Sequence, residues 1–342
     1  MLSKRLVTIL CFAIAAGVVL GVAAAAASAA ATLQGAGSTL IAPLEDEWAL
    51  AWAATSGNTA PVYQPAGSGK GLSEIGAGQV DFGASDGPLS ASTTTCPGCF
   101  QIPWALSAIG IGWNIPGVHK LNLTGKVLAE IYLGQITNWD SSAITKLNPG
   151  EHFPNLAITP LHRTDPSGDS YAFTDYMSSV SSAWSSRVGR GTKPTFPVGP
   201  GAQGDSGMVT VMTGTRGSIA YVAVSYLIGH RLGAAGIQNA AGRFEVPNLR
   251  NISNAAGAVH SVPADREIHI VNPPKSAKIA YPISTFTYGI LRSPDPLGNG
   301  PELKSFVQYA LGPGQSLGER LDFAPLPSKV LAADNAAAGH IR

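Results

Sequence analysis

Three short β-prone runs near the start of the chain each end in a turn built from small or hydroxyl-bearing residues. They begin at Thr32, Pro61 and Val80, and the first is followed by Leu44 and Trp48 at helical spacing. Strands that alternate with helices predict an α/β fold. The same alternation continues, with helices predicted over 126–132, 171–179 and 301–311 and β-prone runs over 102–115, 156–163, 217–226 and 281–291.

Length and charge restrict the classes of protein to which the chain can belong. Its 342 residues are enough for two domains, and 45% of them are hydrophobic while only 13% are charged. A chain of this composition should fold compactly. Its formal net charge of +1 offers no basic surplus, so we expect no nucleic-acid partner.

The N-terminus has the pattern of an export signal. Lys4 and Arg5 precede an uncharged apolar run over 6–22, and Ala27-Ser28-Ala29 offers a cleavage site between small residues. We therefore predict a signal peptide over 1–29 and a mature protein in the periplasm or at the cell surface. The alternative is an uncleaved segment that tethers the protein to the membrane, since the apolar run continues to Ala31.

Two cysteines, Cys96 and Cys99, remain in the predicted mature chain. In an oxidising compartment we expect them to form a short structural disulfide. A redox role is the alternative, but such a role favours a cysteine pair at a helix start beside a strand, and this pair lies in a loop rich in Ser, Thr, Pro and Gly.

One motif suggests an enzyme. Gly204-Asp205-Ser206-Gly207 matches the residues around the nucleophile of trypsin-like proteases, but no histidine has the local context of a catalytic base, and the pattern is α/β. We identify no nucleophile–base pair, no metal cluster and no cofactor motif. The sequence therefore predicts a protein that is not an enzyme and carries neither metal nor cofactor.

Other turns suit a small tetrahedral oxyanion, which needs many hydrogen-bond donors in little space. Helix N-termini supply unpaired N–H groups, serine and threonine hydroxyls add donors, and an arginine adds a charged bidentate contact. These features occur at Ser38-Thr39-Leu40, Gly67-Ser68-Gly69 and Ser167-Gly168-Asp169, with Arg163 just before the third turn. Each turn alone is also compatible with an ordinary capped helix.

Taken in order, these and further motifs resemble the phosphate-binding proteins of the Pst ABC transporter over nearly the whole mature length. The matching segments are Gly35-Ala36-Gly37-Ser38-Thr39, Gly67-Ser68-Gly69, 80–86 with Pro88-Leu89, 131–134, Asn138-Trp139-Asp140, 163–168, 217–222 and Leu326-Pro327. The resemblance implies the type II periplasmic-binding fold, in which two α/β lobes are joined by two crossings.

The resemblance also implies a set of ligand contacts. The implied donors to phosphate are Thr39, the backbone of Leu40, Ser68, Arg163 held by Asp165, Ser167 and Gly168. Asp86 would accept a hydrogen from the ligand. Sulfate carries no such hydrogen at neutral pH, so Asp86 would distinguish the two anions.

Asp169 departs from the family pattern, in which many members have threonine at this position. A carboxylate beside an anion would weaken binding. We interpret Asp169 instead as a residue of the helix N-terminus, where aspartate is favourable, with its side chain turned away from the anion and its backbone N–H still donating to the ligand. It remains part of the predicted site.

The predicted lobes are 32–112 together with 284–342, and 113–283 between them, with crossings near 110–114 and 283–287. The expected function is extracytoplasmic capture of inorganic phosphate by hinge closure and delivery to the permease subunits of an ABC importer, by a protein that is a monomer. The alternatives are a binding protein for another oxyanion or a small organic phosphate, and a phosphatase-like enzyme.

Overall fold

The computed structural model describes residues 32–92 and 96–342, so the predicted signal peptide over 1–29 lies outside the described residues. The strands are β1 (Gln34–Gly37), β2 (Val62–Pro65), β3 (Phe82–Ser85), β4 (Cys99–Trp113), β5 (Asn122–Leu123), β6 (Thr159–Arg163), β7 (Gly201–Ala202), β8 (Ser218–Ala223), β9 (Gly236–Gln238), β10 (Phe244–Glu245) and β11 (Ser284–Arg292). The helices are α1 (Ala42–Ser56), α2 (Ser68–Gly76), α3 (Gly125–Tyr132), α4 (Ser142–Thr145), α5 (Gly168–Val180), α6 (Ser182–Arg187), α7 (Gly204–Gly214), α8 (Val224–Gly229), α9 (Leu249–Ala256), α10 (Gly300–Leu311) and α11 (Ser328–Ala338), with short 3₁₀ helices η1 (Leu89–Ala91) and η2 (Pro313–Leu321).

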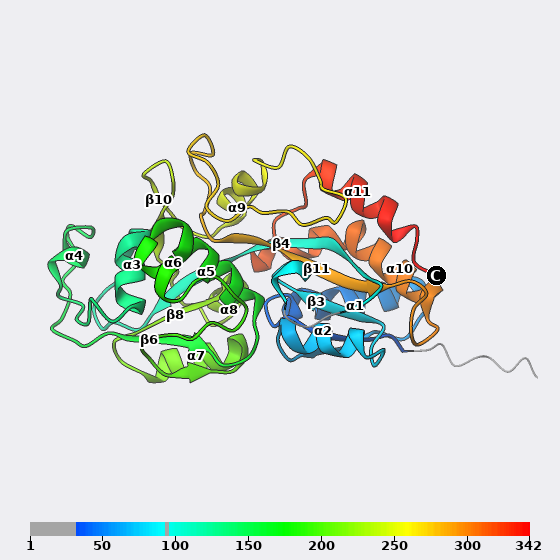
Figure 1. The fold of residues 1–342 in the computed structure, drawn as a ribbon, viewed down its shortest axis with the longest axis horizontal. Coiled ribbons are helices and arrows are strands. Elements are labelled where there is room, and N and C mark those ends of the chain that lie inside the picture. Colours follow the sequence, from blue (N-terminus) through cyan, green and yellow to red (C-terminus); the bar gives the residue numbers. More distant parts are fainter. Residues whose placement is uncertain (1–31, 93–95) are drawn as a thin grey trace, which may run out of the picture. The chain divides into compact units, whose positions relative to one another are not determined.

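Most of the strands form one mixed sheet of eight strands in the order β2-β1-β3-β11-β4-β8-β6-β7. β1, β2 and β3 are parallel to one another, and so are β6, β7 and β8. The long strands β4 and β11 pair antiparallel and connect these two parallel groups (Figure 1). The fold is therefore the mixed α/β architecture that the sequence predicts.

The register of β4 places the two parallel groups end to end. Its residues up to Ala108 pair with β11, and its residues from Ile109 to Trp113 pair with β8. Along β4, β3 runs towards Ala108, while β8 runs in the opposite direction and ends opposite Ile109. The carboxyl ends of both groups thus point towards the middle of β4, and carboxyl ends of strands are where α/β sheets bind ligands.

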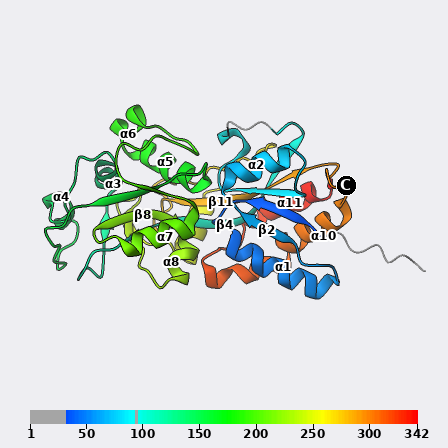
Figure 2. The same ribbon diagram turned by 90° about the horizontal axis from the view of Figure 1, so that it is seen from below.

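Buried apolar residues explain why these segments form strands and helices. β4 and β8 are buried along nearly their whole length, as expected for strands covered on both faces. Near β1–β3, Trp48 of α1 packs edge-to-face on Trp104, which contacts Phe82 in the same way. Near β6–β8, the Phe173 ring of α5 stacks on that of Tyr221. Figure 2 shows α1 and α2 on opposite faces of the strands beside them.

Two predicted elements differ from the observed ones. The run over 217–226 was expected to be strand throughout, but β8 ends at Ala223 and α8 follows at once. Residues of this run are buried in the strand and at the start of the helix. Their hydrophobic pattern therefore has no period that would distinguish a strand from a helix. The α5 helix begins at Gly168, before the predicted start at Tyr171, because Ser167 caps it.

Cys96 and Cys99 form the expected disulfide at the start of β4. In the part of the chain that the structure describes, the apolar helices are all too short to cross a membrane.

Candidate functional site

The turns after the carboxyl ends of the strands converge, and most of the helices that start there begin without a side-chain cap. The N-cap residues Ile41 of α1, Gly67 of α2 and Gln203 of α7 make no side-chain capping hydrogen bond. Uncapped N-termini keep N–H groups that can donate to an anion. α5 differs, because the Ser167 hydroxyl accepts hydrogen bonds from the N–H groups of Asp169 and Ser170.

Asp86 follows β3 and accepts hydrogen bonds from three hydroxyls. The Ser38 hydroxyl lies 2.7 and 2.6 Å from its two carboxylate oxygens, Thr287 donates to Oδ1 at 2.8 Å and Ser68 to Oδ2 at 3.4 Å. The residue is only 2% exposed. Burial raises the pKa of Asp86 to about 6, against the hydrogen bonds from Ser38 and Thr287.

Arg163 ends β6 and is surrounded by carboxylates. Its Nε and Nη2 donate to the two oxygens of Asp165, at 2.9 and 2.5 Å, in a bidentate pair. Its Nη1 contacts Asp169 and lies 3.2 Å from Oδ2 of Asp205. Arg163 is 4% exposed, so its charge acts in a largely dry environment. Although burial alone would raise the pKa of Asp165, the hydrogen bond and charge of Arg163 hold it below its usual value.

The turns that follow β1–β3 and the turns that follow β6–β8 form two groups, and these groups contact each other directly at glycine residues. The N–H of Gly69 donates to the carbonyl of Pro166 at 3.0 Å, and the N–H of Gly168 donates to the Ser68 hydroxyl at 3.1 Å. A side-chain carbon on Gly168 would lie 2.6 Å from the backbone nitrogen of Asp86. Glycine is required there because the backbones of distant segments approach too closely for any side chain.

The structure brings most of the predicted site residues into two neighbouring networks, which Leu40 and Ser167 flank. Ser68, Asp86 and Gly168 meet in one of them. Thr39 joins the other through a 2.5 Å hydrogen bond to Asp205, which also contacts Arg163. Leu40 is fully buried just before α1, and the Ser167 hydroxyl caps α5.

The interpretation of Asp169 as a side chain turned away to the helix end is wrong. Its carboxylate contacts Arg163 and is 1% exposed. The cap of α5 is already supplied by Ser167, and a buried guanidinium is a stronger partner for a carboxylate than a helix N-terminus. Asp169 therefore places another carboxyl group inside the site.

Sequence reasoning missed two residues of the networks, Asp205 and Thr287, and it named Ser38 only as part of a turn, without its contact to Asp86. Asp205 lies in the first turn of α7, and its other oxygen, Oδ1, accepts a hydrogen bond from the N–H of Ala223 at 2.8 Å. Its only signal was the protease-like motif, which the sequence analysis set aside. Thr287 lies on β11, 201 residues from Asp86, and no local pattern marks it.

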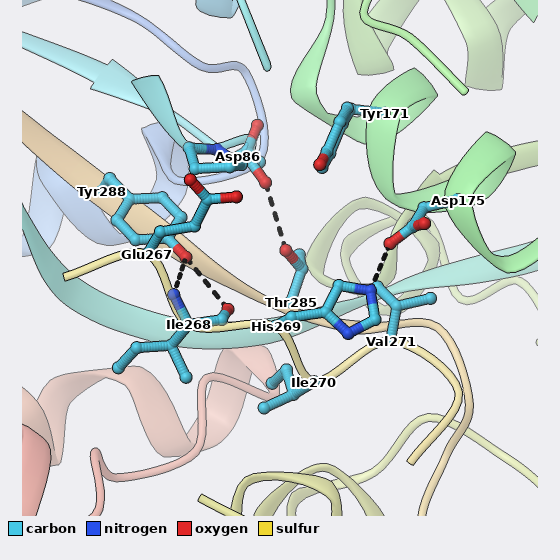
Figure 3. A pocket seen from close by; sticks show the side chains of 11 residues that line it. Asp86, Tyr171, Asp175, Glu267, Ile268, His269, Ile270, Val271, Thr285 and Tyr288 are labelled. Carbon is cyan, nitrogen blue, oxygen red and sulfur yellow. Dashed lines mark hydrogen bonds and ion pairs between the residues drawn. The ribbon is translucent and has the colours of Figure 1, made fainter. Parts of the chain in front are cut away.

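Two cavities adjoin the networks. The first, of about 20 Å³, is lined by Asp86 and among others by Tyr171, Asp175, His269 and Thr285 (Figure 3). It is large enough for about one water molecule. The second, of about 310 Å³, is lined by Thr39, Pro65, Ala66, Gln203, Gly204, Asp205, Ser206 and Tyr226.

Comparisons with known proteins identify the family of the chain. The model of the PBP superfamily domain matches residues 22–313. The phosphate-binding protein PstS of Xylella fastidiosa is 33% identical over 303 residues, which cover 87% of this chain and 82% of the relative. The protein of the same name from Pasteurella multocida is 32% identical over 307 residues, with 88% of each chain covered.

Solved structures share the fold. A high-affinity periplasmic phosphate-binding protein, PfluDING, aligns with a TM-score of 0.70 at 20% identity and covers 90% of this chain and 93% of its own. A phosphate-binding protein from Stenotrophomonas maltophilia aligns with a TM-score of 0.68 at 17% identity, covering 90% and 94%. Together with the sequence relatives, they lead to one conclusion: the chain belongs to the PstS family of phosphate-binding proteins, within the PBP superfamily.

Proposed function

We propose that the chain binds inorganic phosphate outside the cytoplasmic membrane and delivers it to an ABC-type importer. Its sequence relatives are named phosphate-binding proteins, and it is a binding protein rather than an enzyme. The ligand contacts that we propose are Thr39, Leu40, Ser68, Asp86, Arg163, Ser167, Gly168 and Asp169.

The observation that carries the proposal is the meeting of Ser68, Asp86 and Gly168 from turns that are far apart in the chain, beside the buried Arg163. Hydroxyls, N–H groups and one guanidinium are the donors that a small oxyanion needs. In this proposal, hydrogen bonds of the network are exchanged for hydrogen bonds to phosphate when the ligand enters.

Asp86 provides the selectivity in this proposal. Its carboxylate oxygens accept hydroxyl hydrogens, so they can equally accept the hydrogen of a protonated phosphate. Sulfate would place an oxygen without hydrogen against the buried carboxylate. Sites built around a ligand hydrogen bond reject an analogue that lacks it by about 10⁴–10⁵-fold.

We further propose two lobes, 32–112 with 284–342 and 113–283, that close on the ligand. The change of partner along β4 at Ala108 and Ile109 supports a boundary in this region. Closure would bring the turn around Gly69 onto the turn around Pro166, where the structure has a hydrogen bond. Rotation about β4 and β11 is the type of hinge motion that binding proteins use.

The place of action is the periplasm or the cell surface, and the partners are phosphate and the permease subunits of the importer. One structural relative is described as periplasmic, and the sequence predicts a signal peptide over 1–29. Tethering by an uncleaved N-terminus is the alternative. We propose that the protein acts as a monomer.

Titration calorimetry with phosphate, sulfate, arsenate and molybdate tests this function. The wild-type protein should bind phosphate far more tightly than sulfate. Arg163→Ala should abolish phosphate binding, because it removes the cation and leaves buried carboxylates unpaired. Asp86→Asn should bring the affinities for phosphate and sulfate closer together.

Arg320→Ala is the matched control, since Arg320 pairs with Glu47 outside the site. It should leave phosphate binding unchanged. Undiminished phosphate binding by Arg163→Ala would refute the site. If the protein binds another anion more tightly than phosphate, the proposed ligand is wrong, but the proposed site is still supported.

A further inference from the structure

The site holds more negative charge than one arginine can balance. If Asp86, Asp165, Asp169 and Asp205 were all ionised beside Arg163, this buried group would carry a net charge of −3. In the part of the chain that the structure describes, Arg163 is the one cation that pairs with these carboxylates. An incoming phosphate adds further negative charge, and burying unbalanced charge is costly.

The four carboxylates are not equally satisfied. Asp165 has the bidentate pair with Arg163, and Asp86 has its hydroxyls. Asp205 accepts from the N–H of Ala223 and from the Thr39 hydroxyl. Asp169 differs, because its Oδ1 is buried and has no hydrogen-bond partner among the described residues.

Asp169 and Asp205 also compete for the same donor atom. Both approach Nη1 of Arg163, so their charges lie close together in a dry region. Two carboxylates in such a position cannot both stay ionised without a large cost, and one of them keeps a proton. The orphaned Oδ1 makes Asp169 the carboxyl group that holds it.

The other titratable groups that face Asp169 and Asp205 do not neutralise the negative charge of this pair. Tyr221, whose hydroxyl exchanges a 2.7 Å hydrogen bond with Ser170, and Tyr226 near Asp205 are neutral phenols. Burial raises the pKa of each of them well above its usual value. Asp86 adds another negative charge. Burial first, and then the charge of Asp205, raises the pKa of Asp169 well above its usual value, against the charge of Arg163.

We propose that the phosphate complex keeps the proton of the Asp169–Asp205 pair and that Asp169, as the acid of the pair, shares this proton with a phosphate oxygen. This inference rests on the proposed phosphate-binding function and specifies the charge state of the bound complex. Two hydrogens then lie between protein and ligand: one is accepted by Asp86, and the other bridges Asp169 and phosphate. The complex has the proton count of dihydrogen phosphate bound to ionised carboxylates, wherever the second proton resides. Binding therefore takes up one proton at any pH at which the free pair has lost it.

The coupling predicts that the affinity for phosphate falls as the pH rises. Once the free pair has lost its proton, each further pH unit must weaken phosphate binding about tenfold, because one proton is taken up per ligand. Replacing the pair with neutral amides removes this dependence. The double variant Asp169→Asn/Asp205→Asn should therefore bind phosphate more tightly than the wild type at high pH.

Calorimetry of the full chain with sodium phosphate between about pH 6 and about pH 10, in two buffers of different ionisation enthalpy, measures both the affinity and the protons taken up. Above the pH at which the free pair loses its proton, the wild type should take up about one proton per phosphate and lose about tenfold in affinity per pH unit. Counted per monohydrogen phosphate, the double variant should take up no proton, and its Kd for this species should vary by less than about threefold over the range. Asp169→Asn alone, which leaves the contacts of Asp205 in place, should behave like the double variant and serves if the latter does not fold.

Asp334→Asn is the matched control, because Asp334 is a buried carboxylate on α11, outside the site. It should keep the wild-type slope and proton uptake. If wild type and Asp169→Asn show the same slope and the same uptake, the coupling is refuted while the proposed function stands. If the wild type binds no phosphate at any pH, the proposed function fails, and the coupling fails with it.

Discussion

Asp334 and Glu45 are buried carboxylates whose surroundings work against ionisation. Neither oxygen of either side chain has a hydrogen-bond partner within the described residues. The guanidinium of Arg266 lies 3.8 Å from Asp334, which is too far for a hydrogen bond. Burial raises the pKa of Glu45 well above its usual value, and it raises that of Asp334 to about 8 despite Arg266. Such groups make the stability of a fold depend on pH.

Asp334→Asn should flatten this pH dependence. The pKa of Asp334 is higher in the folded protein than in the unfolded chain, so its proton stabilises the fold fully below the unfolded value. That contribution is lost as the pH rises towards about 8. Urea unfolding at about pH 5.5 and about pH 8.5 should show the wild type losing about 2–3 kcal/mol more than the variant.

Asp140→Asn is the control, because Asp140 is exposed and should leave the wild-type pH dependence intact. Equal losses of stability in the wild type and Asp334→Asn would mean that Asp334 is ionised in the folded protein throughout this range.

At the level of elements, the helix starts at the site divide into two kinds. α1, α2 and α7 begin without a side-chain cap, whereas Ser167 caps α5. A hydroxyl that accepts capping hydrogen bonds still has its own hydrogen to donate. Ser167 can therefore stabilise α5 and contact phosphate at the same time.

Ser167→Ala separates these two roles when it is compared with Ser181→Ala. The Ser181 hydroxyl caps α6, which lies outside the networks, by accepting from the N–H of Trp184 at 3.2 Å. Each variant should lose about 1 kcal/mol of unfolding free energy, as is usual for a lost cap. Only Ser167→Ala should also weaken phosphate binding in calorimetry. If both variants bind like the wild type, Ser167 is a cap and not a ligand.

The elements around the site were largely predictable because each carries a local signal. β1 and α1 followed from an apolar period and a glycine-rich turn, and Arg163 from its place at the end of a strand. Asp205 and Thr287 could not be predicted in this way. Asp205 lies 166 residues from Thr39 and Thr287 lies 201 from Asp86, so only the folded chain brings them together.

The direction of the Asp169 side chain was predicted wrongly for a related reason. An aspartate at a helix start is locally consistent with capping, and nothing near it in the sequence shows that Ser167 already fills that role. Its actual partner depends on how α5 is placed against β6, which is a tertiary property. The charge conflict at the site therefore became visible only with the structure.

For the molecule as a whole, ligand capture depends on contacts between the two groups of turns. These groups face each other across the middle of β4, and the hydrogen bonds of Gly69 and Gly168 join them. If the proposed lobes open to admit phosphate, both hydrogen bonds break in every opening event. A ligand that binds only the closed form suppresses opening in proportion to its saturation.

Hydrogen exchange of backbone amides measures this coupling directly. With phosphate at about 100 times its Kd, the amides of Gly69 and Gly168 should exchange about 100-fold more slowly than without it. The amide of Gly242, which donates within the short turn between β9 and β10, opens locally and should not change. If Gly69 and Gly168 exchange at the same rate with and without phosphate, while calorimetry shows binding, the ligand enters without the lobes parting and β4 and β11 are not a hinge.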